Sequence, residues 1–193
     1  MLLSEAEVKL NSIDKDKAPI PARNKGGRGQ WVEIQLGLNL GSDLLDFDDG
    51  EGKTFKEGEP ISVTMLQHCF YDVFNNVSFS DSKVGKKLNN VLFVKFAKSG
   101  KFVKSLVSNL QTHQELHIKL REDYEFICNE IRRRYDNNEE LSTINGKHNL
   151  LQIRTKASKT KLGKYVPLEY NGRRLKDKAM AFYLTTTFEQ NIF

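Results

Sequence analysis

Apolar residues recur at helical spacing in several parts of the chain. Residues 2–13 have the pattern of a short amphipathic helix, with Ser4 as a plausible N-cap and Glu7 as its capping-box partner. Residues 31–40 form an apolar stretch that predicts a buried helix. Residues 102–134 keep helical spacing over a length that fits one long helix or two consecutive helices.

Other segments alternate apolar and polar residues or are rich in β-branched residues, and these predict strands. They are residues 51–56, 61–66, 91–97, 150–156 and 180–185. Residues 158–178, rich in Gly, Lys and Arg, predict a long loop or a hairpin. Because helices and strands are mixed without a regular βαβ alternation, we expect a mixed α+β or α/β domain with a central sheet.

Composition narrows the class of protein. The chain has 193 residues, enough for one domain or a two-lobed one. No apolar stretch approaches the roughly 20 residues of a membrane span, so we expect no membrane partner. Cys69 and Cys128 are far apart and form no CxxC motif, which favours buried thiols and a cytoplasmic location.

The net charge of +5 permits a polyanionic partner but does not demand one, and its distribution says more. Residues 43–59 hold seven acids against two lysines. Residues 151–180 hold nine bases against two acids. A polyanion would be attracted by the second segment and repelled by the first, unless the acids bind a cation. Two solvated loops of opposite charge remain the simpler interpretation of charge alone.

A group of acids and one lysine could carry chemistry. Glu33 lies on the face of the predicted helix that otherwise looks buried, so it needs a base, a proton or a metal. If residues 51–56 form a strand, Glu51 and Lys53 point to the same face. Asp46, Glu51 and the backbone carbonyl of Gly52 could hold Mg²⁺. Lys53 could then orient or deprotonate a water that attacks a phosphodiester. A polar hairpin loop would explain the same spacing.

Several short strings, in order along the chain, resemble the MutH family of DNA endonucleases, which includes the mismatch-repair nickase and GATC-cutting restriction enzymes. The resemblance runs from about residue 25 to the end of the chain. The strings are KGGRGQWVEIQLG (25–37), DF (46–47), EGKT (51–54), KKL (86–88) before VLFV (91–94), LREDY (120–124), LQIRTKA (151–157), and FYL (182–184) followed by Phe188.

The resemblance implies a metal-dependent nuclease of the PD-(D/E)XK class. The fold would be a single restriction-endonuclease-like domain over residues 1–193, with a central mixed sheet flanked by helices. Its two lobes, roughly residues 1–100 and 101–193, would flank a cleft for duplex DNA. The implied site residues are four acidic or lysine side chains of the active site and a further lysine beside it, namely Glu33, Asp46, Glu51, Lys53 and Lys87.

The resemblance also implies the residues that bind DNA. Lys25 matches a lysine in the loop before the helix of Glu33, Arg154 and Lys156 match the DNA-reading loop, and Tyr183 matches an aromatic residue of the recognition region. We expect Lys159, in the same basic segment, to bind DNA as well. A lysine there could reach guanine O6 and N7, while the other bases would neutralise phosphates.

We therefore expect a Mg²⁺-dependent, sequence-specific endonuclease that acts on double-stranded DNA at GATC or a related site. A homodimer on DNA or a mismatch-repair activator are the implied protein partners. A non-cleaving DNA-binding domain of the same fold is the alternative, because Gly52 stands where the family usually has an apolar residue and the gap from Asp46 to Glu51 is short. A basic protein-interaction domain is the second alternative.

Overall fold

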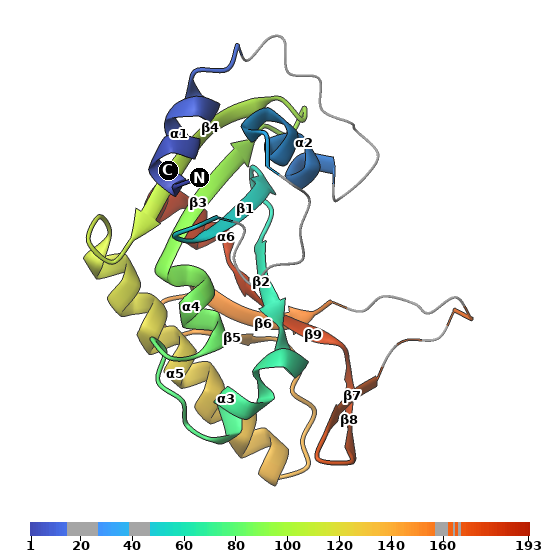
Figure 1. Ribbon diagram of the computed structural model, residues 1–193. Coiled ribbons are helices and arrows are strands. Elements are labelled where there is room, and N and C mark those ends of the chain that lie inside the picture. The colour runs from blue at the N-terminus through green and yellow to red at the C-terminus, as the bar shows by residue number, and fades with distance from the viewer. Residues whose placement is uncertain (15–26, 39–46, 157–161, 164, 166) are drawn as a thin grey trace. The chain divides into compact units, whose positions relative to one another are not determined.

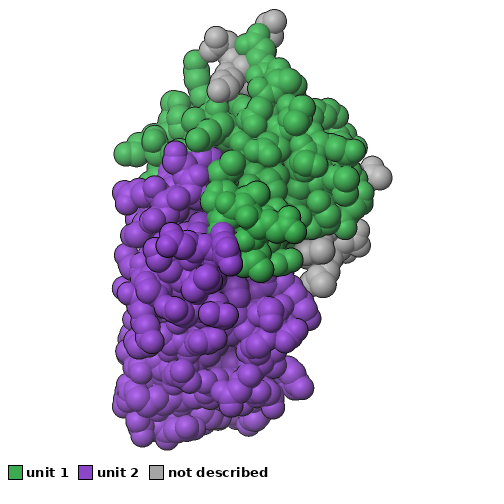
Figure 2. Space-filling view, turned by 90° about the vertical axis from the view of Figure 1, so that its left-hand side faces the viewer, with its two compact units in different colours: residues 1–61, 87–113 green, residues 62–86, 114–193 purple. Residues whose placement is uncertain are grey.

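The computed structural model describes residues 1–14, 27–38, 47–156, 162–163, 165 and 167–193. These residues form a mixed α+β structure with several sheets (Figure 1). They divide into two compact units, coloured in Figure 2. Unit 1 comprises residues 1–61 and 87–113, and unit 2 comprises residues 62–86 and 114–193. Each unit is thus built from two stretches of chain, whereas the predicted lobes are continuous.

Unit 1 is built on a three-stranded sheet in the order β1-β3-β4. β1 runs parallel to β3, and β3 runs antiparallel to β4. The sheet is accompanied by two helices in the same unit (Figure 1). The bounds are α1 Leu3–Asn11, α2 Gly27–Leu36, β1 Glu51–Lys56, β3 Asn90–Phe96 and β4 Phe102–Asn109.

The core of unit 1 lies between the two helices and one face of its sheet. Apolar residues of α1 and α2 join Leu92, Val94 and Phe96 of β3 in one buried cluster. The indole ring of Trp31 contacts the rings of Phe96 and Phe102 at 5.7 and 5.9 Å. Because alternate strand residues point to opposite faces, the other face of β3 carries Val91, Phe93 and Lys95.

Unit 2 is built on a second sheet with the order β2-β9-β6-β5, and a separate hairpin is formed by β7 and β8. The long helix α5 contacts β5, β6 and α3. The bounds are β2 Ile61–Met65, a 3-10 helix Leu66–Cys69, α3 Phe70–Phe74, α5 Gln114–Asp136, β5 Ile144–Asn145, β6 Leu151–Thr155, β7 Pro167–Tyr170, β8 Arg173–Lys178, β9 Met180–Leu184 and α6 Thr186–Ile192. A further helix, α4 (Lys83–Asn89), leads directly into β3.

Antiparallel pairing of β6 with β9 gives this second sheet two different faces. Leu151 pairs with Leu184 and Ile153 with Phe182, all of them fully buried. The ring of Phe182 contacts Tyr124 of α5 at 6.0 Å, so α5 covers this apolar face. The opposite face of the sheet carries the residues that alternate with these along β6 and β9.

Most predicted strands are confirmed, but part of the predicted long helix is wrong. Residues 102–109 form strand β4, and only Gln114–Asp136 are helical. Gly100, at φ +92°, makes the turn that folds β4 back onto β3. The helical spacing of Leu106 and Leu110 is coincidental, since Leu106 pairs with Phe93 and Leu110 is 52% exposed.

The helix ends also differ from the prediction. Ser4 is not the N-cap of α1, because that position is Leu2, whose N–H donates to the Glu5 carboxylate at 3.0 Å. α2 starts at Gly27 rather than at Trp31. The helices α3, α4 and α6 were not predicted because each is too short to show a clear apolar period.

Both cysteines are buried and free, as expected for core residues. Burial raises the pKa of each thiol to about 12. None of the helices in the described ranges is long and apolar enough to cross a membrane.

Candidate functional site

Strand β1 places Glu51 and Lys53 on the same face of the sheet in unit 1. In the parallel register Glu51 lies beside Val91, and Lys53 lies beside Phe93. Residues in register on neighbouring strands share a face, so both side chains lie opposite the cluster that contains Leu92. The expectation that this stretch is a strand with its acid and lysine on one side is confirmed.

The turn before β1 fixes the position of Glu51, the first residue of that strand. A Cβ on Gly50 would lie 2.3 Å from the carbonyl oxygen of Asn90, so only glycine lets the turn approach β3 this closely. The side chain of Asn90 donates to the backbone oxygen of Asp49 at 2.8 Å. The Asp49 carboxylate in turn accepts the backbone N–H of Leu3 at 2.8 Å, which ties α1 to the same turn.

Glu51 is a buried carboxylate with two lysine partners. Its side chain is 4% exposed. Its Oε1 atom accepts a hydrogen bond from Lys53 and another from Lys87, the latter at 2.7 Å. Its Oε2 atom is buried and accepts no hydrogen bond within the described part of the chain. One oxygen is therefore held by two cations, and the other is buried with its capacity unused.

Glu33 shows a similar unsatisfied oxygen. It lies on α2, which contacts β1 within unit 1. Its Oε2 atom is buried and has no hydrogen-bond partner among the described residues. Among the described residues, no hydrogen bond joins the side chain of Glu33 to Glu51. The structure therefore brings Glu51, Lys53 and Lys87 together, and it leaves Glu33 on the neighbouring helix.

The remaining predicted residues of the acidic segment have other places. Asp46 lies outside the described residues, as do Lys25 and Lys159. Asp48 and Asp49 are exposed turn residues. Of the predicted metal-binding carboxylates, Glu51 is thus the one that the structure describes as fully buried.

Glu51 offers one oxygen of the type that a hard divalent cation takes as a ligand. A buried ionised carboxylate oxygen without a partner is costly, and Mg²⁺ prefers carboxylate and carbonyl oxygens as ligands. The described residues contain no group of three or more His, Cys, Asp and Glu side chains that could hold a metal. Asp46, the third acid of the predicted set, is not among them.

A second group of predicted residues meets on the sheet of unit 2. The guanidinium carbon of Arg154 lies 5.7 Å from the centre of the Tyr183 ring, and the Lys156 ammonium lies 5.9 Å from it. Arg154 and Lys156 are exposed, and Tyr183 is half-buried. The structure therefore gathers all three described residues of the predicted reading surface around one aromatic ring.

The cross-strand register explains this gathering. Tyr183 pairs with Gln152, so Arg154 is its diagonal neighbour on the face opposite α5. Burial raises the pKa of the Tyr183 hydroxyl, while the charge of Arg154 opposes that shift. The phenol thus stays protonated at neutral pH and can donate a hydrogen bond.

Ser62 also belongs to this surface, and it was not among the residues predicted from the sequence. Its hydroxyl accepts a hydrogen bond from the Lys156 ammonium at 2.7 Å. The contact depends on β2 and β9 being neighbours in the sheet, a pairing of strands far apart in the sequence. No local pattern could have shown it.

Comparison with known proteins adds no family assignment: no protein-family model matches the chain, and a search of curated proteins finds no match.

Proposed function

We propose that the chain is a Mg²⁺-dependent, sequence-specific endonuclease that hydrolyses phosphodiester bonds in double-stranded DNA. The observation that carries this proposal is the Glu51 carboxylate. It is buried, two lysines donate to one of its oxygens, and its other oxygen has no partner in the described structure. A buried carboxylate oxygen without a partner is uncommon in a purely structural ion pair, and a bound cation would supply that partner.

Each residue of the site has a role in this proposal. Glu51, Asp46, Glu33 and the backbone carbonyl of Gly52 would hold the cation. Bound Mg²⁺ would polarise the scissile phosphate and lower the pKa of the attacking water. Lys53 is held beside Glu51 by its hydrogen bond, where its ammonium can stabilise the negative charge that develops on the phosphate.

Lys87 would act on the same carboxylate from α4. By donating to Oε1 at 2.7 Å, it keeps that oxygen engaged and leaves Oε2 for the cation. It would also add a second positive charge beside Glu51, where we propose that an anionic substrate binds.

In this proposal, residues of unit 2 recognise the base sequence of the DNA. Arg154 lies on β6 and Lys156 directly follows that strand; both are exposed, and both lie near the aromatic ring of Tyr183. Arg and Lys donate to guanine O6 and N7 in the major groove. GATC as the site, Lys25 and Lys159 as further DNA contacts, and a restriction-endonuclease-like fold with a cleft for DNA are parts of the proposal that rest on the resemblance.

The test uses purified full-length chain, Mg²⁺ and two duplexes that differ only in the presence of GATC. Cleavage of the GATC duplex is expected, and Lys53→Ala should reduce it about 100-fold or more, as loss of a catalytic proton-transfer or charge-stabilising group does. The matched control is Lys56→Ala, which removes a lysine of the same strand from the opposite face. It should cleave at the wild-type rate.

Two outcomes would reject cleavage as the function, and a third would reject the Glu51 group as its site. Wild-type chain that binds the duplex without cutting it would indicate a non-cleaving DNA-binding domain. Equal activity of Lys53→Ala and Lys56→Ala would show that the Glu51 group is not the active site. A chain without any salt-sensitive DNA binding would point instead to a protein-interaction domain.

A further inference from the structure

The hairpin of unit 2 carries a row of cations that the proposed active site does not use. Arg174, Lys176 and Lys178 of β8 are exposed, and they alternate with the buried Leu175 and Asp177. Alternate residues of a strand lie on one face, so the three cations form a single row. We call these three residues the β8 row.

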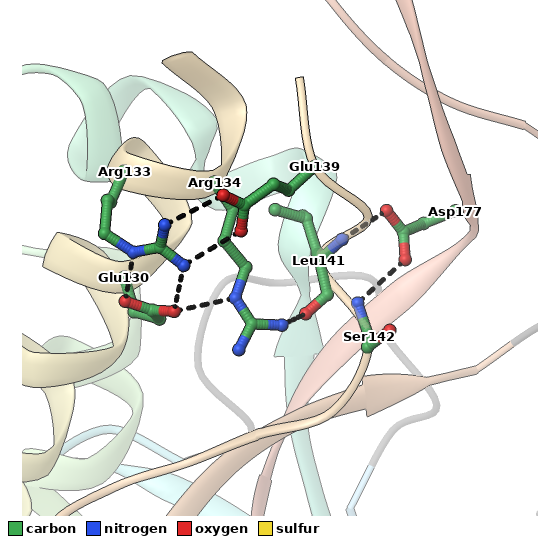
Figure 3. A network of polar contacts seen from close by, with 7 residues as sticks. All are labelled: Glu130, Arg133, Arg134, Glu139, Leu141, Ser142 and Asp177. Atoms are coloured by element: carbon green, nitrogen blue, oxygen red, sulfur yellow. Dashed lines mark hydrogen bonds and ion pairs between the residues drawn. The ribbon is translucent and has the colours of Figure 1, made fainter. Parts of the chain in front are cut away.

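The acids near the β8 row do not neutralise it. Asp177 faces inward, where its carboxylate accepts the backbone N–H groups of Leu141 and Ser142 at 2.8 and 3.0 Å (Figure 3). Glu169 of β7 is opposite Arg174 in the register. It is exposed and makes no ion pair with Arg174 in the described part of the chain, so the three cations of the row have one exposed acid beside them and a positive excess remains.

The hairpin is also held firmly against the rest of unit 2. The ring of Tyr170 stacks on Phe74 of α3 with centroids 4.1 Å apart and planes 8° apart, and it meets Tyr135 of α5 at 5.7 Å. The guanidinium of Arg173 lies 4.5 Å from the Tyr135 ring. β8 is therefore fixed at its turn by aromatic contacts and along its length by Asp177.

The segment that Asp177 binds is itself anchored to α5. Arg134 donates to the carbonyl oxygen of Leu141 and to the carboxylate of Glu130 (Figure 3). Arg133 donates to Glu130 and to Glu139, so the end of α5 and the segment after it form one network. A cation on such a fixed strand loses less conformational entropy on binding than one on a free loop.

We propose that the β8 row is a second nucleic-acid contact, which binds the phosphate backbone without reading sequence. Residues two apart on a strand are about 6.7 Å apart, so the row spans about 13 Å. A duplex carries one phosphate per about 1.7 Å of its axis, which offers about eight phosphates over that length. The inference rests on the proposed function only in its choice of double-stranded DNA as the polyanion.

The experiment measures affinity for a fluorescent duplex that lacks GATC, without divalent cations, between 50 and 200 mM salt. The variant is Arg174→Gln/Lys176→Gln/Lys178→Gln in the full chain. Loss of three phosphate contacts should lower the slope of log Kd against log salt by about 2.7. Over this fourfold range of salt, wild-type affinity should therefore fall about 40-fold more than that of the variant.

The matched control is Lys119→Gln/Arg121→Gln/Lys147→Gln, which removes one arginine and two lysines that are also exposed in unit 2. It should keep the wild-type slope. The single variant Lys176→Gln should lose about 1 unit of slope and guards against misfolding of the triple variant. Circular dichroism of each variant checks the fold.

The result separates this inference from the proposed endonuclease. A lower slope for the β8 variant alone supports the row, even if no form of the chain cuts DNA. An unchanged slope, an equal loss in both triple variants, or no duplex binding at 50 mM salt overturns the row. Specific cleavage of GATC duplex would still support the endonuclease in those cases.

Discussion

Asp123 is a buried acid whose removal should strongly destabilise unit 2. The residue is fully buried on α5. Its carboxylate accepts the backbone N–H of His148 at 2.6 Å, that of Leu150 at 2.8 Å and that of Leu151 at 2.9 Å. Leu151 is the first residue of β6, the strand that carries Arg154. Asp123 therefore fixes the start of the proposed DNA-reading strand.

The magnitude follows from the three donors. Asp123→Ala leaves these N–H groups without their acceptor, and each buried unsatisfied donor costs about 1–3 kcal/mol. We expect the free energy of unfolding to fall by roughly 3–5 kcal/mol. Gly146→Ala tests the same packing without removing the acid, because its Cβ would lie 2.1 Å from the Asp123 carboxyl carbon.

The assay is urea denaturation followed by circular dichroism, with the slope against urea compared between variants. The control is Glu125→Ala on the same helix, where the side chain is 58% exposed. Its effect should stay within about 0.5 kcal/mol. A loss of less than about 1 kcal/mol for Asp123→Ala would mean that these hydrogen bonds do not stabilise unit 2 as expected, since even one buried donor without an acceptor should cost that much.

Three further predictions follow from other parts of the structure. Gly50→Ala should destabilise unit 1, because its Cβ would clash with a backbone carbonyl of β3 at 2.3 Å, whereas Gly29→Ala meets nothing within 4 Å and should be tolerated in a thermal melt. Cys69 and Cys128, buried with pKa values raised to about 12, should resist a thiol reagent at pH 8 until denaturant is added. Two arginines lower the pKa of Glu130 to about 2, below its ordinary 4.5. Its stabilising contribution is complete above pH 4.5 and is lost as the pH falls toward 2, so wild type should lose an advantage of at most about 1 kcal/mol over Glu130→Gln in that window.

Strands with a local signal could be predicted from the sequence. The bounds of β1 match the predicted residues 51–56, because acid, lysine and Phe55 alternate with the residues between them. β4 could not be predicted in the same way. It is recognised as a strand only by its pairing with β3. Two of its buried residues, Ser105 and Ser108, are polar, so its sequence does not show the usual alternation of apolar buried and polar exposed residues.

In the candidate site, too, local features could be predicted from the sequence and contacts between distant residues could not. That Glu51 and Lys53 share a face follows from the two-residue period of a strand, which the sequence alone provides. The hydrogen bond from Lys87 joins residues 36 positions apart and depends on α4 leading into β3 beside β1. Lys156 and Ser62 are 94 positions apart, and their contact likewise requires the order of strands in the sheet.

Counting acids and bases along the sequence does not show which charges are exposed on the folded protein. Asp177 belongs to the basic segment and lowers its net charge, yet its carboxylate is buried in unit 2, where it accepts hydrogen bonds from two backbone N–H groups. Asp49 belongs to the acidic segment, yet it serves the first turn of α1. Because Asp177 is buried while the β8 row is exposed, the outer face of β8 presents bases without the acid that the sequence places among them. Glu51 differs from Asp177 and Asp49, since one of its oxygens accepts from two lysines and the other has no partner in the described structure, and it is the acid that we propose binds a cation.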